Sequence, residues 1–309
     1  MPLFRNIVQR RKLVCRIKGG LGNQLFCYAA ARRLALVNEA ELVIDVVNGF
    51  SRDTLYGRSY MLDNFSIPCR KATPAERMEP FERARRAAAK LISRVRPFDA
   101  RRYIEQEGIE FDPRLLDFKF QGTVYIDGLW QSENYFKDHQ AQIRSDLKMK
   151  DEVDEENLSM ARLIKSSESV AVHFRFFDKP DSNKKSHNLG MDYYKRALDK
   201  ICIKIRTPHF FIFSDQPQVA TQLFGQEIRH IEAFTIVDIN HKSGNDFNDF
   251  WLMAKCKHFI IANSTFSWWA AWLGMDEKKI IIAPGKIISS SGITAWGFEG
   301  LVPVGWTKI

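Results

Sequence analysis

The second half of the chain alternates short apolar runs with longer amphipathic segments. The apolar runs are short and rich in β-branched or aromatic residues, which predicts buried strands at 170–175, 210–213, 228–231, 259–262 and 280–283. Helical spacing predicts helices between and after them at 192–205, 217–224, 246–256 and 264–273. Apolar strands that alternate with amphipathic helices are typical of a parallel sheet covered on both faces. The pattern therefore predicts an α/β fold.

The first half begins in the same way but has a different middle. A strand at 13–17, the glycine-rich segment GGLGNQLF, a helix at about 24–37 and a strand at 42–46 form a β-α-β start. Residues 51–120 are polar, basic and prone to form helix, and a strand at 124–129 then leads into a helix that ends near 147. The charged segment 149–156 has no apolar periodicity. We place a boundary there and predict two domains, 1–150 and 151–309.

Polar side chains follow three of the predicted strands in the second domain. They are His173, Arg175 and Asp178 after the first strand, Ser214 and Asp215 after the second, and Asn263, Ser264 and Thr265 after the fourth. Ligands of parallel sheets bind outside the carboxyl ends of the strands. The three clusters are therefore expected to converge on one binding site.

The segment Asn263 to Phe266 is the most informative of the three. Ser264 and Thr265 have the chemistry of a helix N-cap, and a strand, a polar turn and a helix N-terminus together make an anion site. Phe266, Trp268 and Trp269 add aromatic surface beside it, which suits a nucleotide. The alternative for Trp268 and Trp272, spaced four residues apart, is that both only pack in the core.

The other two clusters each have a functional and a structural interpretation. Arg175 has a planar, permanently charged group suited to a diphosphate, and Asp178 is suited to orienting it or to accepting a proton from a substrate hydroxyl. The alternative is an Arg–Asp pair that only fixes a loop. Ser214 and Asp215 are suited to contacts with ribose, phosphate or base, or else to a plain N-cap for the next helix.

The glycines of the first domain leave a dinucleotide site as an alternative. Gly19, Gly20 and Gly22 follow a strand, and Asp45 lies 23 residues beyond Gly22, where a ribose-binding acid is expected in NAD-binding folds. The third glycine of that fingerprint is replaced by Leu25, which opposes close packing of helix on strand.

Net charge and cysteine content limit the classes of binding partner and the compartment expected for this protein. The net charge is +9, and residues 83–102 hold eight Arg or Lys against Asp99 alone. This basic run is a solvated helix face, a contact for anionic lipid or, with no accompanying motif, a nucleic-acid patch. No secretory leader, transmembrane segment or metal-binding motif is expected, and five scattered cysteines favour a reducing cytoplasm.

Five ordered segments resemble the motifs of one enzyme family. They are GGLGNQLFCYAAARRLAL from Gly19, GLWQSENYF from Gly128, VAVHFRFFD from Val170, FFIFSD from Phe210 and DFWLMAKCKHFIIANSTFSWWAAWL from Asp249. Together they are similar to the α-1,2-fucosyltransferases of glycosyltransferase family 11. The resemblance implies a GT-B architecture, in which two Rossmann-like domains face a cleft and the C-terminal one holds GDP. It also implies inverting, metal-independent transfer of L-fucose from GDP-β-L-fucose to the 2-hydroxyl of a terminal galactose, with no cofactor.

The family's functional residues are transferred position by position. Arg175 and Asp178 are the implied catalytic residues, with Asp178 as the first candidate for the general base. The implied GDP-fucose site comprises His173, Arg175, Ser214, Asp215, Asn263, Ser264, Thr265 and Phe266. The implied acceptor side of the cleft comprises Gly20, Gly22, Asn23, Gln24, Trp130 and Gln131. We expect a galactose-terminated glycan as acceptor, no nucleic acid, and a cytoplasmic protein that touches an anionic membrane through 83–102.

The sequence departs from the family pattern H-x-R-R-x-D at one position. Phe176 replaces the second Arg, and Phe177 replaces the usual glycine that follows. If Phe176 faces the cleft, a cation beside the diphosphate is lost; if it faces the core, it belongs to the packing. Two alternatives therefore stay open, a GT-B transferase that uses another nucleotide sugar and a non-catalytic protein that binds a nucleotide or glycan.

Overall fold

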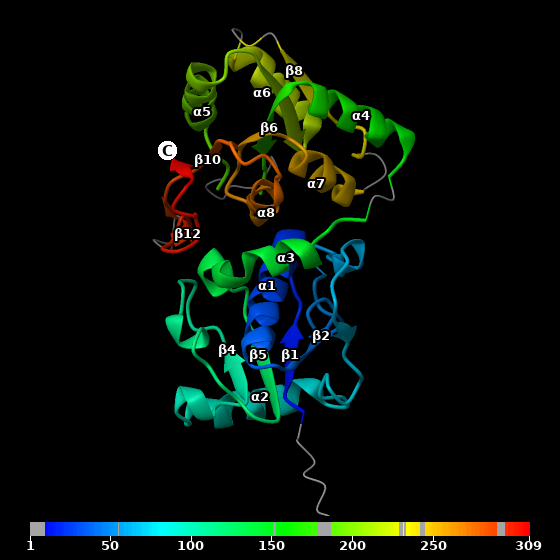
Figure 1. The fold of residues 1–309 in the computed structure, drawn as a ribbon, viewed down its shortest axis with the longest axis vertical. Helices are drawn as coiled ribbons and strands as arrows, with labels where there is room; N and C mark the ends of the chain where they lie inside the picture. The colour runs from blue at the N-terminus through cyan, green and yellow to red at the C-terminus, as the bar shows by residue number, and fades with distance from the viewer. Residues whose placement is uncertain are drawn as a thin grey trace, which may run out of the picture. The chain divides into compact units, whose positions relative to one another are not determined.

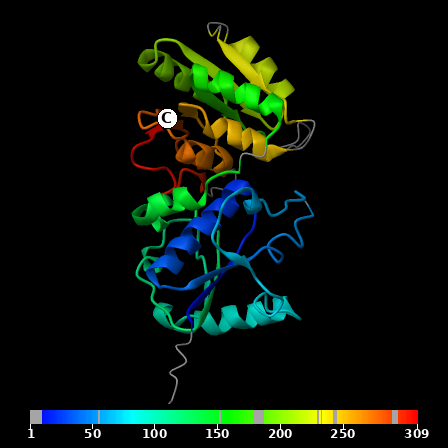
Figure 2. The same cartoon turned by 45° about the vertical axis from the view of Figure 1, so that its right-hand side comes forward.

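A computed structural model describes residues 10–54, 56–150, 153–177, 187–228, 231, 233–241, 245–288 and 294–309. The chain divides into two compact units, with the division between Lys148 and Met149 (Figures 1 and 2). This lies two residues before the predicted boundary. Each unit is described by itself below.

The first unit is built on a parallel sheet of five strands. The strands are β1 (Lys12–Arg16), β2 (Glu41–Asp45), β3 (Arg70–Lys71), β4 (Tyr103–Glu105) and β5 (Thr123–Asp127), in the order β3-β2-β1-β5-β4. All pairs are parallel, with Val14 opposite Val43 on one side and Tyr125 on the other. The helix α1 (Leu21–Val37) packs on β1 and β2 (Figure 1). Its buried face includes Leu25, so the predicted β-α-β start is confirmed.

The middle of the first unit contains mostly short elements. The helix α2 (Glu82–Arg94) contacts β4, and α3 (Gln140–Asp146) contacts α1. Five 3-10 turns complete the described part, η1 (Leu62–Asn64), η2 (Phe98–Ala100), η3 (Pro113–Leu115), η4 (Glu133–Tyr135) and η5 (Lys137–His139). The sequence prediction missed β4, because only Tyr103 and Ile104 of its three residues are buried and a charged run precedes them.

The second unit has the strand order of a dinucleotide-binding domain. Its six-stranded sheet runs β8-β7-β6-β9-β10-β13, which is 3-2-1-4-5-6 when the strands are counted in chain order, and every pair is parallel. The strands are β6 (Glu168–Phe174), β7 (Pro208–Ser214), β8 (Phe234–Val237), β9 (His258–Ile260), β10 (Ile281–Ala283) and β13 (Thr307–Lys308). The short strands β11 (Ile287–Ile288) and β12 (Thr294–Trp296) pair antiparallel outside this sheet.

Five helices accompany this sheet in the described residues. They are α4 (Glu155–Ser166), α5 (Met191–Lys204), α6 (Pro217–Glu227), α7 (Asp246–Ala254) and α8 (Thr265–Leu273). Val170, Val172 and Phe174, on one face of β6, pack in a cluster with residues of α5 and α6. His173, on the opposite face, contacts α8 through Ser267. The sheet is thus covered on both faces, as its apolar strands predict.

In the second unit one predicted strand was wrong and one helix was missed. Residues 228–231 were predicted as a strand, but α6 continues to Glu227, Ile228 caps it, and the strand is β8 at Phe234–Val237. Ile228 and Ile231 are apolar because both pack in the core cluster next to α5 and α6. The helix α4 was not predicted, because its start lies in the charged segment and only Asn157 and Ile164 are buried.

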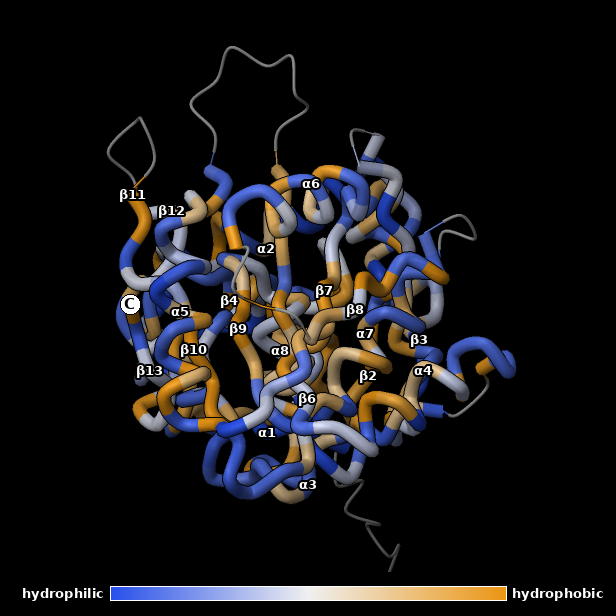
Figure 3. The backbone as a smooth tube through the Cα atoms, turned by 90° about the horizontal axis from the view of Figure 1, so that it is seen from above, coloured by the Kyte–Doolittle hydropathy of each residue, from blue (hydrophilic) through white to orange (hydrophobic). Residues whose placement is uncertain are grey.

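The aromatic residues of α8 belong to the core. Trp268, Trp269 and Trp272 are all buried, and the indole Nε1 of Trp268 donates to the carbonyl of Leu301 at 2.8 Å. Figure 3 shows hydrophobic colour along β9 and β10, the strands that precede and follow this helix. The tryptophans therefore fix α8 to the sheet, and the packing alternative is the correct one for Trp268 and Trp272.

Candidate functional site

The strand order of the second unit marks one place for a ligand. The chain builds β6, β7 and β8 toward one edge of the sheet, then returns to place β9 and β10 on the other side of β6. Open parallel sheets bind ligands outside the carboxyl ends of the strands at this reversal. His173 lies near the carboxyl end of β6 and Asn263 lies just after β9, so both flank the reversal.

His173 is neutral and fixed in position. Its Nδ1 lies 2.8 Å from the hydroxyl of Ser267, and its ring centroid lies 5.8 Å from that of Phe266. Burial, followed by the nearby charge of Arg175, lowers the pKa of His173 to about 3. The imidazole therefore orients α8 against β6 and is not a cation at neutral pH. Ser267 was not predicted as a site residue, although it directly follows Phe266 in the chain.

Arg175 is held by a carboxylate from the neighbouring strand. Its Nη1 donates to Oδ2 of Asp215 at 2.6 Å, and Oδ1 of Asp215 accepts the backbone N–H of Phe176 at 3.1 Å. The side chain of Arg175 remains about one third exposed, with the ring of Phe177 5.4 Å away. Because one end of the guanidinium is fixed and the rest is accessible, Arg175 is preorganised for a bidentate contact with an anion.

Phe176 faces the core. Its side chain packs against the cluster that includes Val172 and Phe174. The position that carries the second Arg in the family pattern is therefore part of the packing in this chain. Ser214 has a local role as well, since its hydroxyl accepts the backbone N–H of Gln216 at 3.0 Å in the turn that begins α6.

The turn after β9 has the predicted cap and one buried acceptor without a partner. Ser264 is the N-cap of α8, and its hydroxyl accepts the backbone N–H of Phe266 at 3.3 Å. Asn263 donates from Nδ2 to the carbonyl of His187 at 3.0 Å, while its buried Oδ1 has no hydrogen-bond partner among the described residues. A buried oxygen without a partner is costly, so a donor on a ligand would stabilise this arrangement. Thr265 begins the helix, where the positive end of its dipole favours an anion.

The structure brings most of the predicted residues of this unit together. The pair Arg175–Asp215 joins the ends of β6 and β7, and the pair His173–Ser267 joins β6 to the first turn of α8. Asp178 lies outside the described residues. Phe177, which directly precedes it, donates its backbone N–H to Oδ1 of Asn188 at 2.8 Å.

In the first unit, the glycine-rich segment turns sharply into α1. Gly19 has a φ of +79°, and a Cβ there would lie 2.8 Å from Nδ2 of Asn23, so only glycine fits. Gly20 is the N-cap of α1, and Asn23 accepts from Nε2 of Gln131 at 2.7 Å. Gly20, Asn23 and Gln131 are all partly exposed and are available to a ligand.

The other predicted residues of the first unit are occupied by the fold. Gln24 is buried and donates to the carbonyls of Gly19 and Ser59 while it accepts from Met61, so it fixes the loop at 59–61. Trp130 is 1% exposed, and Gly22 is buried inside α1. Asp45 accepts three hydrogen bonds from the turn at 47–48, which leaves little capacity for the ribose of a dinucleotide.

Two further properties concern the described residues as a whole. No group of three or more His, Cys, Asp or Glu side chains among them is arranged to hold a metal ion. None of their helices combines the length and the apolar character needed to cross a bilayer.

A sequence model described as glycosyl transferase family 11 matches residues 82–295, which is more than half of the chain. The chain belongs to glycosyltransferase family 11. It is 28% identical over 279 residues to an Escherichia coli protein named alpha-1,2-colitosyltransferase, covering 88% of this chain and 91% of that one. It is 25% identical over 287 residues to the O-antigen biosynthesis glycosyltransferase WbnK of Escherichia coli, covering 87% and 93%. The family membership predicted from the five motifs is confirmed, and the protein is a glycosyltransferase.

One solved structure with a TM-score above 0.5 supports the fold, and a second aligns with a lower score. A mutant of Arabidopsis thaliana FUT1 in complex with GDP aligns with a TM-score of 0.51 at 13% identity, over 88% of this chain and 70% of that one. The fucosyltransferase NodZ from Bradyrhizobium aligns with a TM-score of 0.47 at 18% identity, over 84% and 92%. Both units have the parallel α/β topology of GT-B enzymes, and the predicted fold class is confirmed.

Proposed function

We propose that this family 11 enzyme transfers L-fucose from GDP-β-L-fucose to the 2-hydroxyl of a terminal galactoside, with inversion at the anomeric carbon. The observation that carries the proposal is the pairing of Arg175 with Asp215 at the carboxyl ends of β6 and β7, in a sheet with the strand order of dinucleotide-binding domains. The FUT1 structure is a complex with GDP, and the colitosyltransferase is named for an α-1,2 linkage. The FUT1 complex agrees with the nucleotide proposed here, and the name of the colitosyltransferase agrees with the proposed linkage.

In the proposed reaction, negative charge builds on the β-phosphate as GDP departs. Arg175 stabilises that charge from one side, and the first turn of α8 does so from the other through its backbone dipole. Asp215 fixes the guanidinium before substrate binds, so little reorganisation is needed in the transition state. The unpaired Oδ1 of Asn263 accepts a hydrogen bond from the donor substrate.

The attacking hydroxyl needs a base within hydrogen-bond reach. We assign this role to Asp178, which follows Arg175 by three residues in the chain. His173 is unsuited to it, because its lowered pKa and its contact with Ser267 leave it a weak base. Gly20, Asn23 and Gln131 are assigned to the acceptor side, and no metal ion or cofactor is assigned a step.

The donor sugar has a second candidate. The relative with 28% identity is named for colitose, so GDP-colitose is the alternative donor for this chain. Purified enzyme should be tested with a panel of GDP-sugars for hydrolysis and for transfer to galactosides, with and without EDTA. Transfer of fucose that persists in EDTA supports the proposal. Transfer of another sugar alone corrects the donor, GDP binding without turnover makes the protein a binder, and loss of rate in EDTA that manganese restores reveals a metal site.

We also propose that the enzyme is cytoplasmic and contacts an anionic membrane through α2. All five cysteines are free thiols, which suits a reducing compartment. The outward face of α2 carries Leu91, which is 66% exposed, and Val95 just beyond the helix is 81% exposed. Arg85 and Arg94 of the same helix are exposed as well. An exposed apolar face bordered by cations is the arrangement of helices that lie in a membrane interface.

A further inference from the structure

The first unit contains a pocket of about 570 Å³ that none of the residues assigned to the donor lines. It lies where the order of the first sheet reverses, between the carboxyl ends of β1 and β5, because Arg16 and Lys18 line it and both contact Asp127 at the end of β5. A pocket of this volume is of the size that binds small molecules. Parallel sheets place their ligands at such a reversal.

The lining is strongly cationic. Six cations, Arg16, Lys18, Arg52, Arg58, Arg83 and Arg86, face two acids, Asp53 and Glu82. The positive charge comes from three separate segments of the chain: the end of β1, the loop at 51–58 and the first turns of α2. It is therefore a property of the folded unit and is not explained by the basic run at 83–102 alone.

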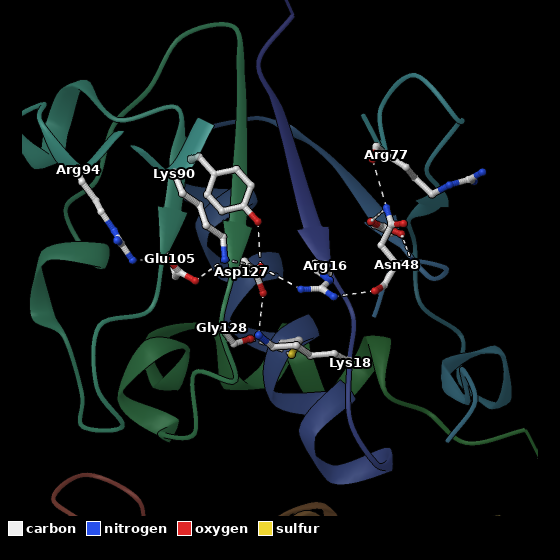
Figure 4. A network of polar contacts seen from close by, with 12 residues as sticks. Arg16, Lys18, Asn48, Arg77, Lys90, Arg94, Glu105, Asp127 and Gly128 are labelled. Carbon is white, nitrogen blue, oxygen red and sulfur yellow. Dashed lines mark hydrogen bonds and ion pairs between the residues drawn. The ribbon is translucent and has the colours of Figure 1, made fainter. Parts of the chain in front are cut away.

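Asp127 orients two of the lining cations (Figure 4). Its carboxylate, 3% exposed, lies 2.7 Å from Nζ of Lys18 and 3.2 Å from Nη1 of Arg16, and it accepts the hydroxyl of Tyr103 at 2.9 Å. Burial raises the pKa of Asp127, but the charges of Lys18 and Arg16 outweigh burial and hold it well below its usual range. The aspartate is thus ionised, and its single charge cannot neutralise both Arg16 and Lys18; it also lies 3.8 Å from Lys90, which pairs with Glu105.

The walls contain cations that the fold does not neutralise. Arg52, Arg83 and Arg86 form no ion pair with another residue in the described part of the chain. Arg58 lies 3.8 Å from Asp53 and stacks over the ring of Tyr56 at 4.2 Å. Unpaired guanidinium groups directed at one pocket repel one another unless an anion joins them. The lining therefore favours a ligand that carries several negative charges.

We propose that this pocket binds a phosphate or diphosphate group on the acceptor of the glycosyl transfer. The role of this group as part of the acceptor rests on the proposed function. The anion site itself rests only on the pocket. Guanidinium groups match the tetrahedral oxygens of phosphate through paired N–H donors. A carboxylate carries one negative charge and would leave most of the lining unneutralised, while a phosphate monoester carries about two.

The place of α2 explains how such an acceptor is presented. Arg86 and Glu82 of this helix line the pocket, while Leu91 on its outward face is exposed to the solvent. If the phosphate is linked to a lipid, the membrane would contact the outward face of α2, where Leu91 lies. The phosphate would then enter the pocket on the other face of the helix. A soluble glycosyl phosphate would use the pocket alone. Both sources present the same phosphate chemistry to the pocket.

The binding test uses the full chain with GDP at saturation, so that the nucleotide site is already filled. Titration with inorganic pyrophosphate should then show one further site per chain. The double variant Arg83→Gln and Arg86→Gln should weaken this binding about tenfold or more. Arg85→Gln is the matched control, because Arg85 is an exposed arginine of the same helix outside the lining, and it should bind pyrophosphate as the parent does.

Kinetics connect the site to the acceptor. The same double variant should raise the KM for galactose 1-phosphate, or for a galactosyl phosphate carried on a lipid in detergent, about tenfold. It should leave the KM for lactose and for the donor unchanged. A larger rise in KM for the lipid-linked acceptor would show that the natural acceptor is attached to a lipid. Equal rises in KM would show that the pocket recognises the phosphate alone.

Three results would overturn the inference. The first is that pyrophosphate does not bind once GDP is saturating, or binds equally to parent and double variant. The second is that the double variant loses binding to phosphatidylglycerol vesicles while pyrophosphate binding is absent, which makes these arginines a membrane contact only. The third is an equal rise in KM for phosphorylated and neutral acceptors. If no sugar is transferred but pyrophosphate still binds in the presence of GDP, the anion site stands and the proposed function fails.

Discussion

Single side chains decide the chemistry proposed for the second unit. Arg175 is useful because Asp215 fixes it and leaves it accessible, and His173 is useful because it stays neutral. The same set shows that position in a motif does not define a role. Phe176 lies beside Arg175 in the chain, yet its partly buried side chain packs against the core cluster.

Replacement of Arg175 by Ala should remove most turnover with little change in KM for the donor, because the lost contact forms mainly in the transition state. The expected cost is about 3 kcal/mol, or a hundredfold or more in kcat. Arg175→Lys should rescue only part, because an ammonium cannot make the bidentate contact. Steady-state kinetics with GDP-fucose measure this, with circular dichroism as the control for folding. A folded Arg175→Ala enzyme with the parent rate would contradict the mechanism.

Phe176→Arg should destabilise the fold and should not improve donor binding. Since Phe176 is partly buried against the core cluster, an Arg there would lose this packing and partly bury a charge, at a cost of about 1 to 3 kcal/mol. Phe177→Arg is the matched control, because Phe177 is 42% exposed and should tolerate a charge within about 0.5 kcal/mol. Urea unfolding of both variants tests this. A stable Phe176→Arg protein that binds GDP more tightly would place the side chain beside the diphosphate.

Asp249→Asn should stabilise the protein at neutral pH. Burial raises the pKa of Asp249 to about 6, against its usual 3.8, although Asn240 donates to it at 2.8 Å. The folded state therefore holds a proton that the unfolded state has lost, so this contribution is present below about pH 4 and is lost as the pH rises to about 6. The Asn variant keeps an oxygen acceptor and should gain roughly 1 to 2 kcal/mol at pH 7 and nothing at pH 4. Thermal unfolding across this pH range measures the difference, and a variant less stable than the parent at pH 7 would refute it.

At the scale of elements, two helices each use one part for packing or solvent contact and another part to line a candidate binding site. The helix α8 buries its tryptophans against the sheet and thereby directs its N-terminus to the strand reversal. The helix α2 directs Arg86 into the pocket of the first unit and leaves its apolar residues outside. Leu91 and Val95, which are four residues apart, are both exposed, so this apolar spacing does not mark a buried face.

Leu91→Ser combined with Val95→Ser should weaken binding to vesicles of phosphatidylglycerol about tenfold or more, because two large apolar side chains would no longer enter the interface. The fold should be unaffected, since both residues are exposed. Ile203→Ser is the matched control, because Ile203 is an equally exposed aliphatic residue in the second unit, at 83%. Vesicle sedimentation at two salt concentrations tests the idea. Equal vesicle binding by the double variant and by Ile203→Ser would contradict the proposed membrane contact.

At the scale of the whole molecule, two parallel α/β units share one design. In each sheet a cation follows the first strand at the point where the strand order reverses, Lys18 in the first unit and Arg175 in the second. The cation is held in both cases by a carboxylate from the neighbouring strand, Asp127 or Asp215. This repetition makes both reversals suitable for anions, which agrees with a donor diphosphate in one unit and an anionic acceptor in the other.

GDP should stabilise the second unit and raise the melting temperature of the whole chain. Ligand at 100 times its dissociation constant adds about 2.7 kcal/mol to the free energy of unfolding by mass action. NADH is the control and should have no effect, because Leu25 occupies the position of the third glycine and Asp45 is engaged by its own turn. Differential scanning fluorimetry tests this. A melting temperature raised by NADH and unmoved by GDP would favour a dehydrogenase.

The amino-acid sequence by itself determined the alternation of strands and helices and the family, and it supplied the candidate residues of the proposed donor site. Periodicity, caps and polar strand ends are local signals, so β6, β7, β9 and the helix after Ser264 could be found without a structure. Exposed or very short elements have weak local signals, which is why β4, α4 and β8 were missed or misplaced. Only the tertiary structure decided which side chains face outward. It turned Phe176 into the core and Leu91 away from it, and it gathered the arginines of three distant segments around one pocket, because such contacts depend on the pairing of strands far apart in the chain.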